Sequence, residues 1–284
     1  MSQKIMVTAD STCDLSRGVA ERFGIQIFPL HVVFPNGDYR DGIDIGSEKV
    51  YEIVGATGVL PKTSAINTQE YIDYVTPYIE QGYEVIHINL GSGLSSCYQN
   101  ALMAADELEG FHPVDSASLS TGSGLLVLAI KEMADEGRSV EEILAAVPEL
   151  REKCKASFVI DTLEYLYKGG RCSALAMFGA NLLNLKPGIE VSTEDGSMGV
   201  GKKYRGPLDK ALVAYVRDKL AGRDDIDTRR VFITHSPIAP EMAELVRGEI
   251  EKYIHFDEVI ETDAGCTISS HCVPGTLGIL FMTK

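Results

Sequence analysis

Short apolar runs alternate along the chain with segments whose apolar residues recur every three or four positions. Residues 84–90, EVIHINL, are mostly apolar without regular alternation, which is typical of a strand buried on both faces of a parallel sheet. Beyond this run, Tyr98, Ala101, Leu102 and Ala105 fall at helical spacing. The pattern therefore predicts a buried strand followed by a helix.

The same alternation predicts elements along the rest of the chain. Strands are expected in residues 4–8, 25–34, 112–118, 157–162, 229–236, 257–265 and 276–282, and helices in residues 16–24, 68–82, 121–137, 140–154, 207–222 and 240–254. The turn signals PNGD at residues 35–38 and Asp195-Gly196 each predict a hairpin. Ser139 and Glu142 have the spacing of a capping box.

Alternating strands and helices predict α/β layers with mixed, largely parallel sheets. The charged helix that ends near residue 153 divides the chain into halves of similar size. We expect an N-terminal α/β domain over residues 1–153 and a C-terminal α/β domain over residues 154–284. Ligands of such proteins favour the cleft between domains and the carboxyl ends of parallel strands.

Composition narrows the class of protein. The 284 residues carry a formal net charge of -15, which argues against nucleic acid as a partner. The N-terminus does not have the pattern of a signal peptide, and no apolar run is long enough to span a membrane. We therefore expect a cytoplasmic protein without stable membrane insertion. The six cysteines lack a C-x-x-C spacing, which predicts free thiols and no metal site.

Four polar clusters lie where strands are expected to end: residues 10–12, 62–64, 91–96 and 265–272. GSGLSS, residues 91–96, matches neither the phosphate loop nor the dinucleotide fingerprint. It is close to a nucleophile elbow but lacks the final glycine, so a serine hydrolase or a phosphotransferase using Ser95 and His271 stays open as an alternative. The start of the next helix, with the Ser95 hydroxyl, could also bind an anion or a carboxylate.

Arginines accompany glycines in two places. In KGGR, residues 168–171, the glycines allow close backbone approach and Arg171 offers a bidentate fork. A helix end followed by a surface arginine explains the same residues. Arg205 in YRG is similar, and in so acidic a chain both arginines indicate points for docking or for phosphate.

Taken together, these motifs resemble the DegV family along essentially the whole chain. The matching segments include ADSTCDLS, PLHVVFPNGDYRDGIDI, PKTS, LGSGLSSCYQNA, DTLEYLYKGGR, LNLKPG followed by KYRG, and SSHCVPGTLGI. The resemblance implies a two-domain α/β fold, related to that of dihydroxyacetone kinase subunits, with one long-chain fatty acid bound between the domains. It also implies that the protein is a carrier without a cofactor, a monomer or weak dimer. Such a carrier presents the acyl carboxylate to a separate fatty acid kinase for acyl-phosphate formation and phospholipid synthesis.

Residue by residue, the resemblance assigns the fatty acid carboxylate to four side chains and kinase docking to two arginines. The carboxylate residues are Thr63, Ser64, Ser95 and His271, and the docking residues are Arg171 and Arg205. The sequence departs from the family pattern at Ala65-Ile66, Ser96-Cys97 and Cys272-Val273, all of which lie in or next to the assigned head-group segments.

An acyl tunnel requires apolar walls, and burying about fifteen methylenes at roughly 0.8 kcal/mol each contributes on the order of 12 kcal/mol before association costs. The acyl chain would then supply most of the affinity. We expect the carboxylate to be held by uncharged donors without a Lys or Arg clamp. The candidate wall residues are Phe28, Leu30, Val32, Phe158, Ile160, Phe178 and Leu183.

Overall fold

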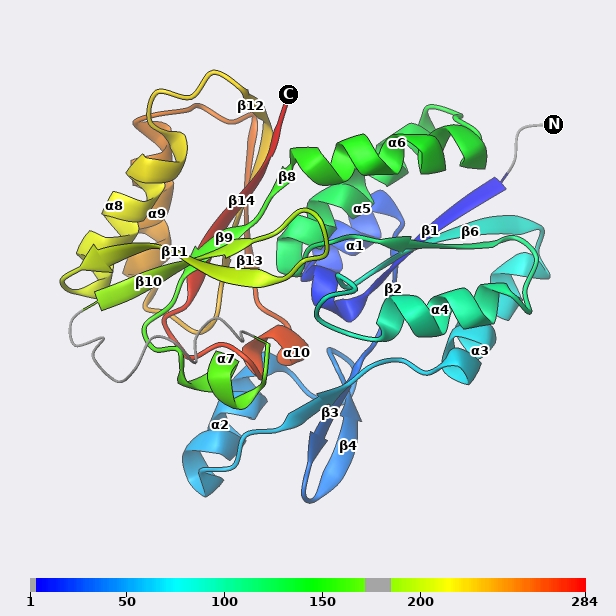
Figure 1. Ribbon diagram of the computed structural model, residues 1–284, viewed down its shortest axis with the longest axis horizontal. Coiled ribbons are helices and arrows are strands. Elements are labelled where there is room, and N and C mark those ends of the chain that lie inside the picture. Colours follow the sequence, from blue (N-terminus) through cyan, green and yellow to red (C-terminus); the bar gives the residue numbers. More distant parts are fainter. Residues whose placement is uncertain (1–3, 172–184) are drawn as a thin grey trace.

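The computed structural model describes residues 4–171 and 185–284, and its strands form three sheets (Figure 1). The first sheet has the order β2-β1-β6-β7 and is parallel throughout. This arrangement confirms the parallel strand predicted around residues 84–90. The strands of this sheet are β1 (Lys4–Asp10), β2 (Gln26–Phe28), β6 (Tyr83–Asn89) and β7 (Phe111–Asp115).

Successive residues of β6 point to opposite faces of the sheet, and both faces are covered. Val85 packs against α3 and α4, whereas Ile86 and Ile88 pack on the side of α5. Burial on both faces explains why this strand shows no alternation of polar residues. The helices of this half are α1 (Arg17–Phe23), α3 (Thr68–Ile79), α4 (Cys97–Ala105), α5 (Ser120–Asp135) and α6 (Val140–Lys153), and a 3-10 turn spans Ser11–Cys13.

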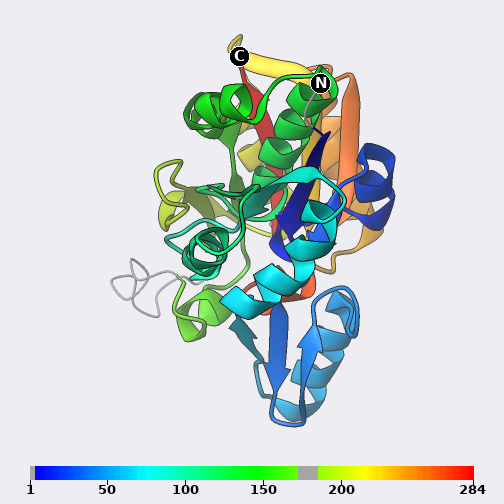
Figure 2. The ribbon, with the colours of Figure 1, turned by 90° about the vertical axis from the view of Figure 1, so that its right-hand side faces the viewer.

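A small lobe projects from one end of the molecule, as Figure 2 shows. Its three-stranded sheet has the order β4-β3-β5 and is antiparallel, and β3 and β4 form the hairpin predicted from PNGD. The lobe consists of β3 (His31–Phe34), β4 (Gly37–Arg40), α2 (Ser47–Thr57) and β5 (Lys62–Ser64).

The third sheet has seven strands in the order β11-β10-β9-β14-β12-β13, and β8 pairs with β14. Only the β12–β13 pair is parallel among the pairs described here. The sheet is thus mixed, as expected, but more antiparallel than its alternating pattern suggests, because β14 inserts between β9 and β12. Its strands are β8 (Cys154–Lys155), β9 (Ser157–Val159), β10 (Leu185–Val191), β11 (Met198–Arg205), β12 (Ile226–His235), β13 (Glu258–Asp263) and β14 (Leu277–Thr283).

Among the described residues, four helices follow residue 153. Two of them, α8 and α9, pack beside each other over one buried cluster that includes Tyr215 and Val246. The helices are α7 (Glu164–Lys168), α8 (Leu208–Leu220), α9 (Pro240–Glu251) and α10 (Cys266–Ser269). Within the described ranges, no helix is long and apolar enough to cross a bilayer.

All strands of the seven-stranded sheet lie after residue 153, and those of the other two sheets lie before it. The two halves nevertheless share apolar surface, since Phe232, Leu280 and Met282 join the core cluster built around α5. The domain boundary near residue 153 stays a prediction. The ends of the parallel strands and the beginning of α10 meet where the halves adjoin, and this region contains the candidate site.

Candidate functional site

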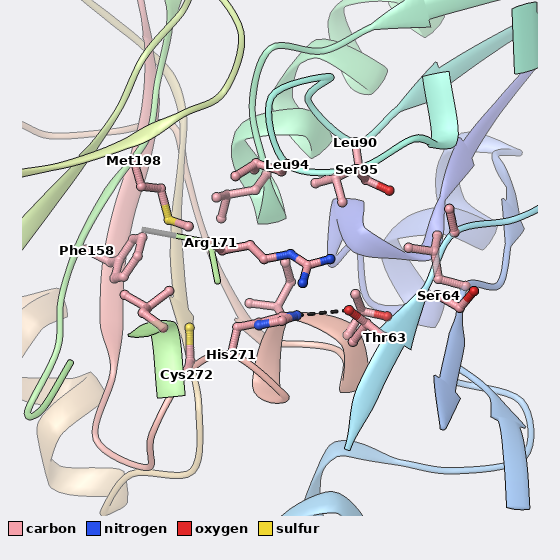
Figure 3. Close-up of a pocket in the computed structure, with 16 residues that line it drawn as sticks. Thr63, Ser64, Leu90, Leu94, Ser95, Phe158, Arg171, Met198, His271 and Cys272 are labelled. Carbon is pink, nitrogen blue, oxygen red and sulfur yellow. Dashed lines mark hydrogen bonds between the residues drawn. The ribbon is translucent and has the colours of Figure 1, made fainter. Parts of the chain in front are cut away.

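A mainly apolar cavity lies between the two halves, with about 540 Å³ of space between its lining atoms, open mouth included. Figure 3 shows its polar side chains gathered on one side and Phe158, Met198 and Cys272 on the other. All four residues assigned to a head group from the sequence line it. The full lining is Leu30, Thr63, Ser64, Ala65, Leu90, Leu94, Ser95, Leu119, Phe158, Leu166, Arg171, Met198, Thr267, Ile268, His271 and Cys272.

Thr63 and His271 form a hydrogen-bonded pair across the cavity wall. Thr63 lies in β5, paired in register with Val32 of β3, and its Oγ1 is 2.9 Å from Nε2 of His271 (Figure 3). Burial, followed by the positive charge of Arg171, lowers the pKa of His271 from 6.5 to about 4. The imidazole is therefore neutral at physiological pH and carries one N–H.

The position of that proton follows from the surroundings of the ring. Nδ1 of His271 is buried without a hydrogen-bond partner in the described part of the chain. An unpaired lone pair is more easily tolerated in the interior than an unpaired N–H. We therefore assign the proton to Nε2, which donates to Oγ1 of Thr63. The Thr63 hydroxyl hydrogen is then free to donate to a ligand.

Two buried aspartate side chains from the N-terminal half position the segment that carries His271. Asp14 Oδ1 accepts the Gly265 amide at 2.9 Å, and the two oxygens of Asp41 accept the amides of residues 266 and 267 at 2.8 and 3.0 Å. Burial raises the pKa of Asp14 to about 8. These bonds tie the beginning of α10, and hence the His271 side of the cavity, to the opposite half of the molecule.

The loop of residues 90–95 brings Ser95 to the cavity, and the amides of residues 90–94 are already occupied. Ser95 Oγ itself accepts the Cys97 amide at 3.2 Å and so caps the start of α4. The expectation that the first amides of this helix bind an anion stays a prediction, although the Cys97 amide already has Ser95 Oγ as its acceptor. The Ser95 hydroxyl donates to Cys97 Sγ at 3.2 Å. The amides of residues 90–94 bond, in chain order, to Asp10 Oδ2 (2.8 Å), Ser118 O (2.9 Å), Asp115 Oδ1 (3.0 Å), Asp195 O (2.8 Å) and Gly91 O (2.9 Å).

Arg171 extends into the cavity between Ser95 and the Thr63–His271 pair, as Figure 3 shows. Its Nη1 donates to the carbonyl of Gly169 at 2.7 Å, which fixes the guanidinium near the polar wall. A cation therefore borders this polar region, whereas the sequence led us to expect uncharged donors without a Lys or Arg clamp; which groups hold a carboxylate stays a prediction. Arg205, the last residue of β11, is exposed and lies outside the cavity lining.

The two glycines before Arg171 have different structural roles. Gly170 has a φ of +69°, the left-handed conformation that commonly follows a helix. Gly169 has a φ of -78°, but a Cβ there would lie only 2.1 Å from Nδ1 of His271. The sequence pattern KGGR gave no sign of the second role, because the histidine lies a hundred residues further along the chain.

The predicted apolar wall is only partly found. Leu30 and Phe158 line the cavity. Phe28 instead stacks on His87, with ring centroids 4.9 Å apart. Ile160 is fully buried in the cluster to which the cavity residues Phe158 and Leu166 also belong. Neither Phe28 nor Ile160 lines the cavity, and Val32 packs in the small lobe. Phe178 and Leu183 lie outside the described residues.

A second cavity adjoins the first and is also mainly apolar, with about 410 Å³ of space between its lining atoms. The two share Leu119, Phe158, Ile268 and Cys272 as a common wall. Small residues, among them Gly278, line its far side next to the seven-stranded sheet. The two cavities therefore lie side by side, on either side of these shared residues.

The geometry does not support nucleophilic catalysis by Ser95. His271 hydrogen-bonds Thr63, while Ser95 Oγ lies 3.2 Å from both the amide and Sγ of Cys97. Within residues 4–171 and 185–284, His271 has no carboxylate partner to orient it, as a Ser-His-Asp arrangement requires. Those residues also contain no cluster of three or more potential metal ligands.

The fold and the cavity together define an α/β protein that encloses a mainly apolar space with a polar head region. The DegV family model, described as an uncharacterised protein family, matches residues 4–284. A DegV domain-containing protein of Clostridium acetobutylicum is 31% identical over 286 residues, 99% of each chain. The chain therefore belongs to the DegV family, which confirms the resemblance seen in the motifs and the predicted fold class.

Two further relatives bear on the ligand. A protein of Thermotoga maritima named a fatty acid-binding protein is 30% identical over 283 residues, covering 97% of this chain and 96% of its own. A solved DegV family protein from Thermus thermophilus, described by its fatty acid binding, superposes with a TM-score of 0.88 at 29% identity. The superposition covers 99% of this chain and all of the other, 100%.

Proposed function

We propose that this chain binds one long-chain fatty acid between its two halves and is a carrier, not an enzyme. The observation that carries the proposal is the cavity itself: apolar walls with a few convergent polar groups at one side, as small-molecule sites typically have. The named ligand class of the relatives from Thermotoga maritima and Thermus thermophilus supports the same conclusion.

The carboxylate binds at the polar wall in this proposal. The hydroxyls of Thr63 and Ser95 donate to it, and the guanidinium of Arg171 offsets the cost of taking its charge out of water. His271 acts through Thr63, because its Nε2–H orients the threonine oxygen. Ser64, the next residue in β5, borders the same region and completes the set.

The acyl chain runs from the polar wall past Phe158 toward the second cavity. Leu119 and Ile268 belong to both cavities, so a chain that follows the shared wall stays in apolar surroundings. Desolvation of the chain contributes about 0.8 kcal/mol per methylene, so most of the affinity comes from this part of the ligand.

Extraction and mass spectrometry test the ligand directly. We expect the purified protein to release one equivalent of a fatty acid on denaturation, and the delipidated protein to rebind it. Thr63→Val and Ser95→Ala each remove one hydrogen bond and should weaken binding about fivefold; Arg171→Gln removes a charged donor and should weaken it about tenfold or more. Ser96→Ala, at an exposed neighbour outside the cavity lining, is the matched control. Failure of the wild-type protein to bind any fatty acid at micromolar concentration refutes the proposal.

We further propose that the carrier presents its ligand to a separate fatty acid kinase, which transfers the γ-phosphoryl group of ATP to the carboxylate. Exposed Arg205 then contributes to docking, and Arg171 lies at the presented head group. Acyl phosphate, trapped as a hydroxamate, should form only when kinase, carrier, fatty acid and ATP are combined. Arg205→Ala should slow its formation without changing fatty acid affinity, while Arg138→Ala should change neither; acyl phosphate made by the carrier alone contradicts the assignment.

A further inference from the structure

The turn between β10 and β11, residues 192–197, reaches from the seven-stranded sheet to the N-terminal half (Figure 1). Its shape is fixed internally: the Ser192 amide donates to Ser197 O and the Gly196 amide to Ser192 O, both at 2.9 Å. The Asp195 carboxylate accepts the Ser197 amide, also at 2.9 Å. From α6, Arg151 donates to the Glu194 carbonyl at 2.5 Å. We call residues 192–197 the hairpin tip.

The hairpin tip lies directly on the loop that leads to Ser95. Gly93 donates its amide to the Asp195 carbonyl at 2.8 Å. A Cβ at Gly93 would lie 2.9 Å from that carbonyl oxygen, and one at Gly91 would lie 3.0 Å from it and from the amide of Ser118. Gly196, with a φ of +82°, is buried with its Cβ direction 3.2 Å from Gly91 Cα. The glycines of GSGLSS therefore allow the backbone of the hairpin tip to approach the Ser95 loop more closely than a side chain would permit.

This contact connects the two sides of the cavity. Ser95 follows Gly93 by two residues, and Met198 follows the hairpin tip by one; both line the cavity, as does Leu94. Displacing the hairpin tip by the size of one methyl group would therefore move both the Ser95 hydroxyl and the Met198 side chain. Backbone contact of this kind cannot relax by a change of rotamer.

We propose that the hairpin tip is a positioning element for the Ser95 loop and that its release from Gly91 and Gly93 precedes exchange of the ligand. The proposal rests on the proposed function for the identity of the ligand, a fatty acid. The hydrogen bond from Gly93 to Asp195 holds Ser95 and Met198 in their positions in the cavity wall.

Gly93→Ala tests the contact, because a methyl group 2.9 Å from a carbonyl oxygen must push the tip away. Gly199→Ala is the matched control: it lies in β11 of the same hairpin, and its Cβ would meet nothing within 4 Å. The dissociation rate of a fluorescent fatty acid is measured by stopped flow on displacement with unlabelled ligand. We expect Gly93→Ala to raise it at least about fivefold, the factor that one lost hydrogen bond corresponds to, and Gly199→Ala to leave it unchanged.

A second variant and a readout without ligand complete the design. Asp195→Ala changes the hairpin tip instead of the Ser95 loop, because it removes the carboxylate that accepts the Ser197 amide. This variant should also accelerate dissociation, and it keeps the test possible if Gly93→Ala folds poorly. Amide hydrogen exchange of residues 90–96 in the ligand-free protein should speed up in both variants relative to Gly199→Ala. Dissociation and exchange rates equal to those of the control overturn the inference. If the wild-type protein binds no fatty acid, the proposed function is refuted. In that case hydrogen exchange alone tests whether the hairpin tip positions the Ser95 loop.

Discussion

Gly169 packs against the imidazole of His271, and Gly169→Ala tests how strictly that ring is positioned. The backbone of Gly169 has φ -78° and ψ -8°, which alanine adopts without strain. A Cβ there would lie 2.1 Å from Nδ1 and 2.8 Å from Cε1 of His271. The third atom near that Cβ, the carbonyl oxygen of Tyr165, is 3.0 Å away, so the variant acts mainly on the ring.

The size of the effect follows from the distances. To bring Nδ1 from 2.1 Å to 3.0 Å, the shortest distance that Cβ atoms tolerate, the ring must retreat by about 0.9 Å. The ring is largely buried, so it cannot turn into solvent, and its bond to Thr63 breaks. Loss of one hydrogen bond costs about 1 kcal/mol and overpacking about 1–3 kcal/mol. We expect a destabilisation of about 2–4 kcal/mol, offset by at most about 1 kcal/mol from replacing a glycine.

Urea unfolding measures this change, with fatty acid affinity as a second readout. The control is Gly248→Ala in the interior of α9, where a Cβ would meet nothing within 4 Å. The control should keep its midpoint or gain about 0.5–1 kcal/mol, while Gly169→Ala should lose both stability and affinity. If Gly169→Ala unfolds at the same urea concentration as the control and binds the ligand as the wild type does, our description of the His271 wall is wrong.

Three further predictions concern titration, thiols and capping. The pKa of His271 is lowered from 6.5 to about 4, so its neutral form stabilises the fold above pH 6.5 and this stabilisation is lost as the pH falls toward 4. The difference in unfolding free energy between wild type and His271→Asn should therefore shrink by up to about 3 kcal/mol over this range, and a constant difference would contradict it. Burial raises the pKa of all five cysteines in the described chain, so Cys172→Ser should show almost no labelling by a thiol reagent until it unfolds; rapid labelling of the native variant would count against this burial. Ser139→Ala removes a capping box and should cost about 1 kcal/mol in thermal or urea unfolding, whereas an unchanged midpoint would show that the cap is dispensable.

Local signals in the sequence were sufficient for most elements of the fold. The capping box at Ser139, the hairpin at Asp195-Gly196 and the unalternating strand of residues 83–89 are present as expected. Such features depend on neighbours within a few residues. The insertion of β14 between β9 and β12 depends on pairing between distant segments, and no periodicity within a strand specifies its partner.

The sequence was sufficient to predict the hydroxyl groups and the histidine of the candidate site. It was not sufficient to predict the contacts that the two halves of the molecule make there. Thr63, Ser95 and His271 carried a family pattern, and all three line the cavity. The entry of Arg171 into the cavity and the contact of Gly93 with the hairpin tip arise from approach between the two halves. A sequence shows that a glycine is present; only the packed chain shows which atoms exclude a side chain there.

The central position of β14 has a consequence for biosynthesis. Both β9 and β12 pair with it, so neither can complete its ladder until residues 277–283 have left the ribosome. Ser157 precedes Leu277 by 120 residues. At about 5–20 residues per second, β9 waits roughly 6–24 s for its partner. The parallel sheet of the first half needs no later strand, so a nascent chain should pass through a stage in which this sheet has formed while β9 and β12 are unpaired and accessible to chaperones.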